Sequence, residues 1–104
     1  MEPIFVYMTT ADEAEAEKIG RVLVETRLAA CVNLIPGMRS LYWWKDTIES
    51  GSEVVLIAKT RRSLLDDLTA KVRQLHSYEV PCIVAYPVAA GLPAYLQWVA
   101  DETR

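Results

Sequence analysis

Uninterrupted apolar runs occur at residues 4–8, 54–58 and 83–86, among others. Short runs of this kind, rich in β-branched and aromatic residues, predict buried strands. Two other segments, residues 11–26 and 62–76, place apolar residues three and four positions apart and charged residues between them. That spacing predicts amphipathic helices. Thr10 and Glu13 have the spacing of a capping box, so we expect the first helix to begin near Ala11.

A long β-hairpin is predicted between the two helices. Residues 31–44 are rich in Val, Leu, Ile, Tyr and Trp, and only Pro36-Gly37 interrupts them. A Pro-Gly pair suits a bulge, so we expect one long bent strand. Residues 45–47 form a polar turn, and the returning strand resumes at Ile48 and continues through residues 53–60.

The remaining elements complete a split βαβ pattern. Residues 82–88 predict a strand, and Pro93 opens a last helix that places Tyr95, Leu96 and Val99 on one face. The order βαββαβ, followed by a helix, predicts an α+β fold: a ferredoxin-like sandwich with helices on one face of an antiparallel sheet. A chain of 104 residues holds one core, so residues 1–104 are expected to form a single domain.

The strands lack the alternation of apolar and polar residues that a half-exposed sheet shows. All three apolar runs are apolar at every position, so both faces of the sheet need cover. Two main helices and a short third one cover one face. We therefore expect a second chain on the other face and a closed symmetric oligomer.

The hairpin tip carries further candidate interface residues. Trp43 and Trp44 are adjacent and must point to opposite faces of a strand, and Tyr42 precedes them. Aromatic side chains are enriched at interfaces, so we expect these three to contact a neighbouring subunit. The alternative is that both tryptophans fold back on their own domain.

Composition excludes several classes of function. The net charge of −3 comes from 14 acidic and 11 basic residues without a basic stripe, so nucleic acid is not an expected partner. No apolar run approaches the roughly 20 residues that cross a bilayer, and no secretory signal precedes the first strand. These features predict a cytoplasmic protein without a membrane partner.

The sequence also gives little evidence of a catalytic site. Nucleophile-elbow, phosphate-loop and zinc-protease motifs are absent, and the single histidine has no second histidine to orient a nucleophile. We expect no enzyme activity. Cys31 and Cys82 lie in apolar surroundings without a C-x-x-C partner, and we expect both to be reduced and buried.

Five segments together carry a resemblance to a known family: AACVNLIPG at 29–37, SLYWW at 40–44, LIAKT at 56–60, HSYEVP at 76–81 and YLQW at 95–98. In this order and spacing they resemble the CutA family of divalent-ion tolerance proteins. The resemblance implies a homotrimer of ferredoxin-like subunits, with strands pairing across subunit boundaries and clefts between neighbours. It also implies a link to tolerance of metals such as copper, and a similarity in architecture to trimeric PII signalling proteins.

Two departures from the family bear on metal binding. Some bacterial relatives have a cysteine near the end of the first strand and a pair of histidines before the tyrosine-containing loop. Those positions correspond to Met8 and to Leu75-His76 in this sequence. The more common His-Pro-Tyr segment is replaced by His76-Ser77-Tyr78, which lacks the rigid proline.

Two candidate sites follow. His76 is a candidate ligand for copper or another divalent cation, with Met8 as a soft thioether ligand; no cofactor is required. The alternative for His76 is a helix-terminal residue whose positive charge is favoured by the helix dipole and that hydrogen-bonds to the loop. A candidate cleft combines charged residues, a hydroxyl and an aromatic ring: Lys59, Tyr78, Glu79, Trp44, Lys45 and Arg39. The alternative is that these residues form interface salt bridges.

Three functional hypotheses remain open. The preferred one is a homotrimeric copper-tolerance protein that binds a divalent cation weakly at an intersubunit cleft near His76. The second is a PII-like sensor that binds a small anionic metabolite between Lys59, Tyr78 and Glu79 of adjoining chains. The third is a structural interaction module without a ligand.

Overall fold

The computed structural model describes all 104 residues as eight elements. In chain order these are β1 (Pro3–Thr10), α1 (Glu13–Glu25), β2 (Cys31–Trp44), β3 (Thr47–Arg61), a 3₁₀ turn (Arg62–Leu64), α2 (Leu65–Leu75), β4 (Ile83–Pro87) and α3 (Pro93–Glu102). The predicted order of strands and helices is confirmed. No helix is long and apolar enough to cross a membrane.

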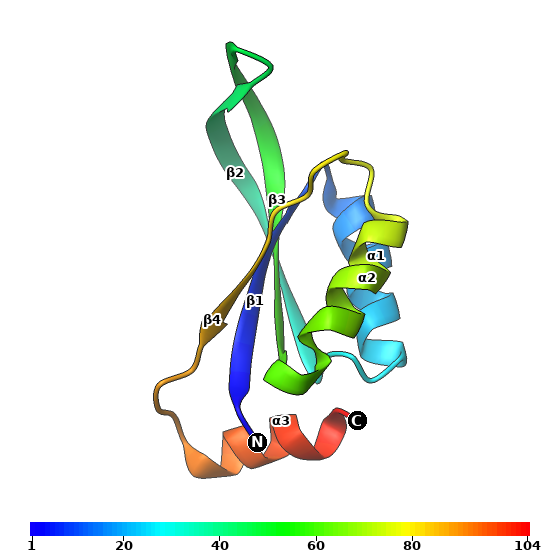
Figure 1. Cartoon of the computed structure of the whole chain (residues 1–104), viewed down its shortest axis with the longest axis vertical. Helices are drawn as coiled ribbons and strands as arrows, with labels where there is room; N and C mark the ends of the chain where they lie inside the picture. The colour runs from blue at the N-terminus through cyan, green and yellow to red at the C-terminus, as the bar shows by residue number, and fades with distance from the viewer.

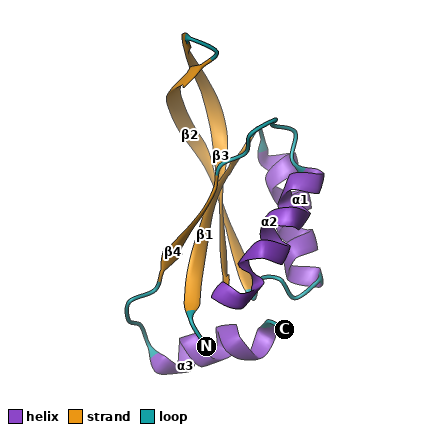
Figure 2. Cartoon of the chain, viewed as in Figure 1, coloured by secondary structure: helices purple, strands orange, loops and turns teal.

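The four strands form one sheet in the order β2-β3-β1-β4, and every neighbouring pair is antiparallel. Figure 1 shows α1 and α2 side by side on one face of this sheet, while α3 crosses the end of the sheet near the N-terminus. The layers are also clear in Figure 2, where both long helices lie to the same side of the strands. The fold is thus a mixed α+β domain of two layers.

The core lies between the sheet and α1 and α2. Alternate residues of β1 and β3 point into it, because successive side chains of a strand face opposite sides. The helices contribute the apolar face that their spacing predicts. The buried cluster consists of Ile4, Val6, Met8, Ile19, Leu23, Leu28, Ala29, Leu56, Ala58, Leu64, Leu68 and Val72.

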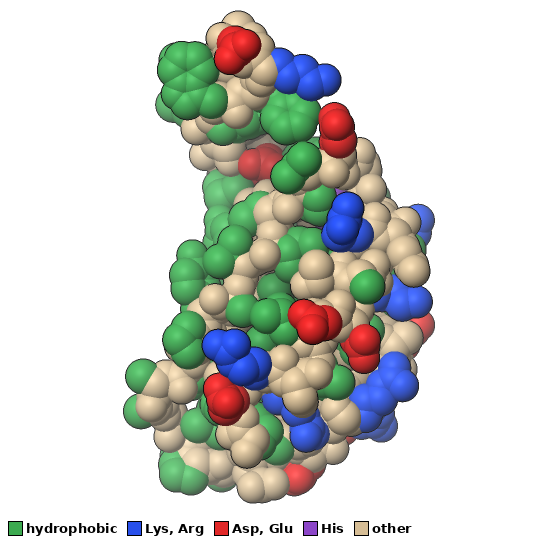
Figure 3. Space-filling model, viewed as in Figure 1, with side chains coloured by type: hydrophobic (Ala, Val, Ile, Leu, Met, Phe, Trp, Pro, Cys, Tyr) green, Lys and Arg blue, Asp and Glu red, His purple; other side chains and the backbone are tan.

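The face of the sheet opposite α1 and α2 is apolar and largely open. In β4 the side chains of Val84 and Tyr86 are 46% and 56% exposed. Their register partners across the sheet include Tyr7 and Phe5 of β1, which are only half-buried. Hydrophobic side chains accordingly gather along the flank below the hairpin in Figure 3. The prediction of apolar residues on both sheet faces is confirmed for the single chain.

Helix α1 begins two residues later than predicted. Asp12, rather than Thr10, is the N-cap, and its carboxylate accepts a hydrogen bond of 2.8 Å from the amide of Glu15. Thr10 instead belongs to β1, where its hydroxyl donates to the carbonyl of Val54 at 3.0 Å. Both residue types can cap a helix, so the strand pairing of Thr10 decides between them.

Helix α3 is attached to β3 through Arg61. The guanidinium of Arg61 donates to the carbonyls of Ala100 and Thr103 at 2.6 Å and to the Thr103 hydroxyl at 3.0 Å. The last turn of α3 contains no basic residue of its own. A cation from the neighbouring strand therefore satisfies the carbonyls that the helix leaves free.

The hairpin of β2 and β3 is the most extended part of the molecule, whose longest dimension is 44 Å (Figure 1). The register shifts between Ile35 and Met38, and Gly37 has a φ of +82°, so the predicted bulge at Pro36-Gly37 is confirmed. The turn is shorter than predicted. Lys45 and Asp46 alone connect the strands, with φ of 50° and 65°, as a tight two-residue turn requires.

The tryptophans at the tip lie on opposite faces of β2. Trp43 is 71% exposed and Trp44 is 38% exposed. Trp43 therefore does not fold back on its own domain, and Trp44 is only partly covered. Such exposure of large aromatic side chains is typical of an association surface.

Both cysteines are free and partly exposed. The expectation that they are buried is therefore wrong for the single chain. Cys31 lies on β2, at the edge of the sheet, and Cys82 lies just before β4, at the opposite edge. Edge positions leave one flank without a neighbouring strand, which the local apolar sequence does not reveal.

Gly20 provides a test of the packing between α1 and the sheet. A Cβ at this position would lie 2.9 Å from Cγ2 of Val32 and 3.3 Å from Cδ1 of Leu56. We expect Gly20→Val to lower the free energy of unfolding by about 1–3 kcal/mol through overpacking. Lys18→Val, at an exposed position of the same helix, places the same side chain in water. Denaturant unfolding of both variants checks this, and an equal loss would contradict the packing argument.

Candidate functional site

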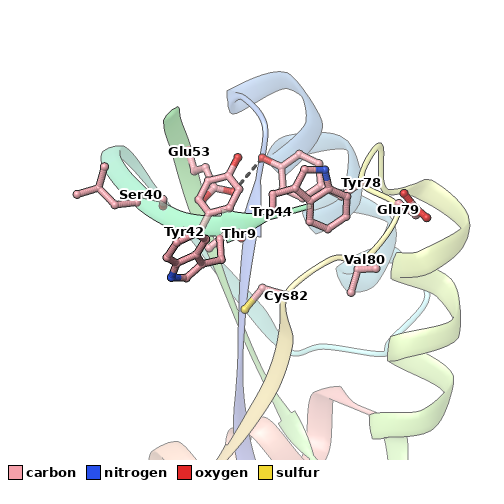
Figure 4. Close-up of a pocket in the computed structure, with 11 residues that line it drawn as sticks. Thr9, Ser40, Tyr42, Trp44, Glu53, Tyr78, Glu79, Val80 and Cys82 are labelled. Atoms are coloured by element: carbon pink, nitrogen blue, oxygen red, sulfur yellow. Dashed lines mark hydrogen bonds between the residues drawn. The ribbon is translucent and has the colours of Figure 1, made fainter. Parts of the chain in front are cut away.

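A cleft of about 630 Å³ lies between the hairpin and the loop that joins α2 to β4. Figure 4 shows the side chains that surround it, from β1, β2, β3 and the loop, with the exposed carboxylate of Glu79 pointing away from Trp44 and Glu53. Its lining residues are Thr9, Ser40, Leu41, Tyr42, Trp43, Trp44, Glu53, Tyr78, Glu79, Val80 and Cys82. The long hairpin forms one wall because it extends beyond the rest of the sheet.

A hydrogen bond between Tyr78 and Glu53 crosses the cleft. The phenol donates to Oε2 of Glu53 at 2.8 Å (Figure 4). Burial, together with this bond and the carboxylate charge, raises the pKa of Tyr78 far above its ordinary value. Tyr78 therefore stays protonated and acts as a donor throughout the physiological range.

Cys82 lies in the same cleft. Burial is the main reason that the pKa of Cys82 is raised, and the charge of Glu53 raises it further. The side chain is thus a thiol at neutral pH, and a thiol is a poor nucleophile. This environment does not favour a catalytic cysteine, although a bound cation would stabilise the thiolate.

Glu15 of α1 holds the start of the loop in place. Its two carboxylate oxygens accept hydrogen bonds from the amide of Ala11 at 2.9 Å and from the amide of Ser77 at 2.8 Å. Burial by itself raises the pKa of Glu15, but the hydrogen bonds from Ala11 and Ser77 outweigh it. The net pKa of Glu15 lies below its ordinary value, so the ionised form stabilises the folded chain.

His76 fixes the loop from the other side. Its Nδ1 accepts a hydrogen bond from the amide of Tyr78 at 3.0 Å, and its Nε2 lies 2.8 Å from the carbonyl of Thr9. An imidazole that accepts at Nδ1 donates its proton from Nε2, which gives the neutral tautomer. The side chain is 0% exposed. His76 therefore positions Tyr78 relative to β1.

The ring hydrogen-bonds to the loop, as the helix-terminal alternative for His76 expects, but its Nδ1 accepts a hydrogen bond and so does not carry the proton of the charged form that this alternative also expects. A metal ion would have to displace one of the two hydrogen bonds to reach a ring nitrogen. Met8, its proposed thioether partner, is 0% exposed and belongs to the core cluster. A role for His76 and Met8 as metal ligands stays a prediction, and it requires local rearrangement.

The structure brings together some of the other predicted site residues and separates the rest. Trp44, Tyr78 and Glu79 line the cleft, as do the predicted interface residues Tyr42 and Trp43. Lys45 and Arg39 lie on the hairpin outside the lining. Lys59 lies on the open sheet face, where its Nζ is 5.5 Å from the ring centroid of Phe5 and 5.7 Å from that of Tyr95.

Sequence reasoning missed four cleft residues that carry a polar side-chain group: Thr9, Ser40, Glu53 and Cys82. Glu53 is the charged residue that immediately precedes an apolar strand run, a position that often places a carboxylate at a sheet end. Cys82 adjoins the candidate loop, but its neighbours suggested burial. Within one chain, no group of three or more His, Cys, Asp or Glu side chains lies close enough together to hold a metal ion.

Glu15 gives a pH-dependent prediction. The pKa of Glu15 is lower in the folded state than in the unfolded chain, where it is near 4.3. Its contribution to the free energy of unfolding is therefore complete at pH values above the unfolded pKa, and it is lost as the pH falls through the folded pKa. We expect Glu15→Gln to lower the free energy of unfolding by about 1–2 kcal/mol at pH 7 and by less at pH 3.

Urea unfolding at a fixed protein concentration measures both values. The matched control is Glu17→Gln, because Glu17 pairs only with Arg21 in an exposed salt bridge, with both side chains 66% exposed. If Glu15→Gln lowers the free energy of unfolding as much at pH 3 as at pH 7, the proposed role of the carboxylate is contradicted.

Comparison with known proteins gives a consistent result over nearly the whole chain. A family model described as CutA1 divalent ion tolerance protein matches residues 4–102. The divalent-cation tolerance protein CutA of Archaeoglobus fulgidus is 42% identical over 99 residues, which cover 95% of each chain. Protein CutA of Mus musculus is 50% identical over 98 residues, or 94% of this chain and 55% of that protein. The chain thus spans little more than half the length of the plant and mammalian relatives it matches.

Solved structures agree with the sequence comparisons. The crystal structure of CutA1 from Oryza sativa has a TM-score of 0.97 and 39% identity, covering 100% of this chain and 95% of that one. The divalent cation tolerance protein from Thermus thermophilus has a TM-score of 0.95 and 41% identity, covering 100% of both chains. On sequence and structure together, the chain belongs to the CutA1 divalent ion tolerance family.

Proposed function

We propose that this protein supports divalent-cation tolerance as a homotrimer that binds copper, or a similar ion, weakly in clefts shared between subunits. The family is named for tolerance of divalent ions. Beyond the family's link to tolerance, we propose that the protein binds the ion directly, that the ion is copper, that the assembly is a trimer and that the protein is not an enzyme. The single observation that carries it is the set of charges lining the cleft.

The lining contains two carboxylates, Glu53 and Glu79, and no Lys, Arg or His side chain. A cavity with charges of one sign concentrates ions of the opposite sign. Cys82 adds a sulfur ligand, which favours a soft or borderline ion such as copper over magnesium or calcium. The chemistry of the cleft thus supports a cation as ligand.

Weak binding follows from the number of donors. A tightly held metal ion normally has three or four converging protein ligands, and a single chain brings together fewer. A neighbouring subunit can supply the remainder if the cleft lies at a subunit boundary. His76 and Met8 join the proposed ligand set only if the loop and the adjoining end of β1 rearrange.

The open sheet face supports the proposed assembly. Val84, Tyr86 and the hairpin tip expose apolar surface that a monomer would leave in water. The sheet order is β2-β3-β1-β4, and α1 and α2 form the connections between β1 and β2 and between β3 and β4. This arrangement is compatible with a ferredoxin-like subunit. Cyclic symmetry would bury equivalent surfaces of all copies.

The hypothesis of an anionic metabolite receives less support. Its proposed ligands were Lys59, Tyr78 and Glu79, but Lys59 does not line the cleft that contains the other two. An anion entering this cleft would meet Glu53 and Glu79. A purely structural role without a ligand remains the alternative that the binding experiments below distinguish.

The compartment is also a proposal. Relatives carry names that place one in the chloroplast and another in the periplasm. For this chain we propose the cytoplasm, supported by two free cysteines that form no disulfide. Free thiols persist in reducing compartments.

Copper titration tests the proposed ligand. We expect calorimetry with Cu(II) to show saturable binding, and Glu53→Gln to weaken it roughly tenfold or more because a charged ligand is lost. Glu49→Gln, on an exposed part of the hairpin outside the cleft, is the control. Wild-type affinity in the Glu53→Gln variant would exclude this cleft as the metal site.

The same titration determines the roles of His76 and Met8. If both are ligands, His76→Gln and Met8→Leu each weaken copper binding as much as Glu53→Gln does. Unchanged affinity in either variant removes that residue from the ligand set. Met8→Leu keeps the apolar volume of the core, so a change in its affinity would report the lost sulfur.

Sedimentation tests the assembly. We expect a mass of about three times the 11.7 kDa of one chain at micromolar concentration. Tyr86→Arg places a charge on the open sheet face and should shift the protein toward monomer, whereas Val24→Arg on α1 should not. A stable, folded wild-type monomer would contradict the proposal.

A further inference from the structure

Most of the cleft surface is unsuited to a bare metal ion. Seven of its eleven lining residues are hydrophobic: Cys82 and Tyr78, which also carry a thiol and a hydroxyl, and Leu41, Tyr42, Trp43, Trp44 and Val80. Figure 4 shows the rings of Tyr42 and Trp44 and the side chain of Val80 among them. A metal ion would use only the few oxygen and sulfur atoms. The part of these aromatic walls that a neighbouring subunit leaves open suits a ligand that also has apolar surface.

The protein itself shows which charged group its aromatic rings accept. The ammonium of Lys45 lies 5.5 Å from the ring centroid of Trp44. A second ammonium, that of Lys59, lies between Phe5 and Tyr95 on the open sheet face. At such distances an ammonium group is attracted to the negative face of the ring. Lys45 itself is not among the residues that line the cleft.

We propose that the cleft binds an organic ammonium ion, that is, an alkylated amine that carries its positive charge on nitrogen and apolar surface on carbon. Glu53 and Glu79 provide the opposite charge, and Trp44 and Tyr42 provide aromatic faces. This inference rests on the cation-binding cleft of the proposed function and adds a second class of cation to it.

Size and hydrogen bonding agree with this ligand class. A volume of about 630 Å³ lies in the range of small-molecule sites and far exceeds the space that a dehydrated metal ion fills. Oε2 of Glu53 accepts a hydrogen bond from Tyr78. The other oxygen, Oε1, has no hydrogen-bond partner within the chain and is therefore available to an N–H donor.

Butylammonium chloride is a suitable probe, and 1-pentanol, a neutral chain of similar length, is its control. Binding to the full chain in its native assembly is followed by ligand-detected NMR, with sodium chloride used to match ionic strength. We expect butylammonium to bind at least several times more tightly than 1-pentanol, because two carboxylates line the cleft.

Variants separate the aromatic contribution from the charge. Trp44→Leu should weaken butylammonium binding by about 3- to 30-fold, the range of one cation–π contact, while Trp98→Leu on α3 should leave it unchanged. Trp44→Phe keeps an aromatic face and should fall between wild type and Trp44→Leu. This intermediate variant distinguishes loss of the ring from a disturbed hairpin.

Comparison with copper separates this inference from the proposed function. Cys82→Ser should weaken copper binding without changing butylammonium binding, and Trp44→Leu should do the reverse. If the protein binds copper but binds butylammonium no more tightly than 1-pentanol, the ammonium site is overturned and the metal proposal is not. Butylammonium binding that depends on Trp44, in a protein that does not bind copper, supports the ammonium site and overturns only the metal proposal.

Discussion

Apolar side chains occupy both faces of the four-stranded sheet, and α1 and α2 seal only one of them. The sealed face contains the core, with Val6, Met8 and Leu56 fully buried. The other face exposes Val84 and Tyr86. Burial of apolar surface is the dominant favourable term in folding and association, so the open face is the strongest physical reason for expecting this chain to associate.

The same sheet creates the cleft. β2 and β3 extend past the end of the core, and the loop after α2 comes to lie beside them because β4 pairs with β1 at the far edge. Glu15 and His76 then fix the loop through backbone amides and the carbonyl of Thr9. The only histidine of the chain thus contributes through position rather than through an exposed ring nitrogen.

The cleft combines carboxylates, a thiol and aromatic rings, and this mixture explains why cations are its expected ligands. Tyr78 is a hydrogen-bond donor to Glu53, and burial, together with the charge of Glu53, raises the pKa of Cys82. The positive groups predicted for the site lie outside the lining: Lys59 on the sheet face, Lys45 beside the ring of Trp44, and Arg39 on the hairpin. Their absence from the lining leaves Glu53 and Glu79 as its only charged residues.

The order of the elements, the two amphipathic helices, the bulge at Pro36-Gly37 and the two-faced apolar sheet were all predictable from the sequence, because periodicity and turn chemistry are local properties. Family membership was predictable from five short segments in order. Tyr78, Glu79 and Trp44, which the sequence offered as cleft residues, line the cleft of the single chain, and their role in binding stays a prediction. Local pattern was sufficient for these features.

Only the tertiary structure decided the rest. Asp12 replaces Thr10 as N-cap because β1 retains Thr10, and the cysteines lie at sheet edges that no local pattern reveals. Glu53 meets Tyr78 across 25 residues, while Lys59, only six residues from Glu53, lies outside the cleft. Partners of this kind are set by strand register and by the path of a loop, which are long-range properties that sequence spacing does not contain.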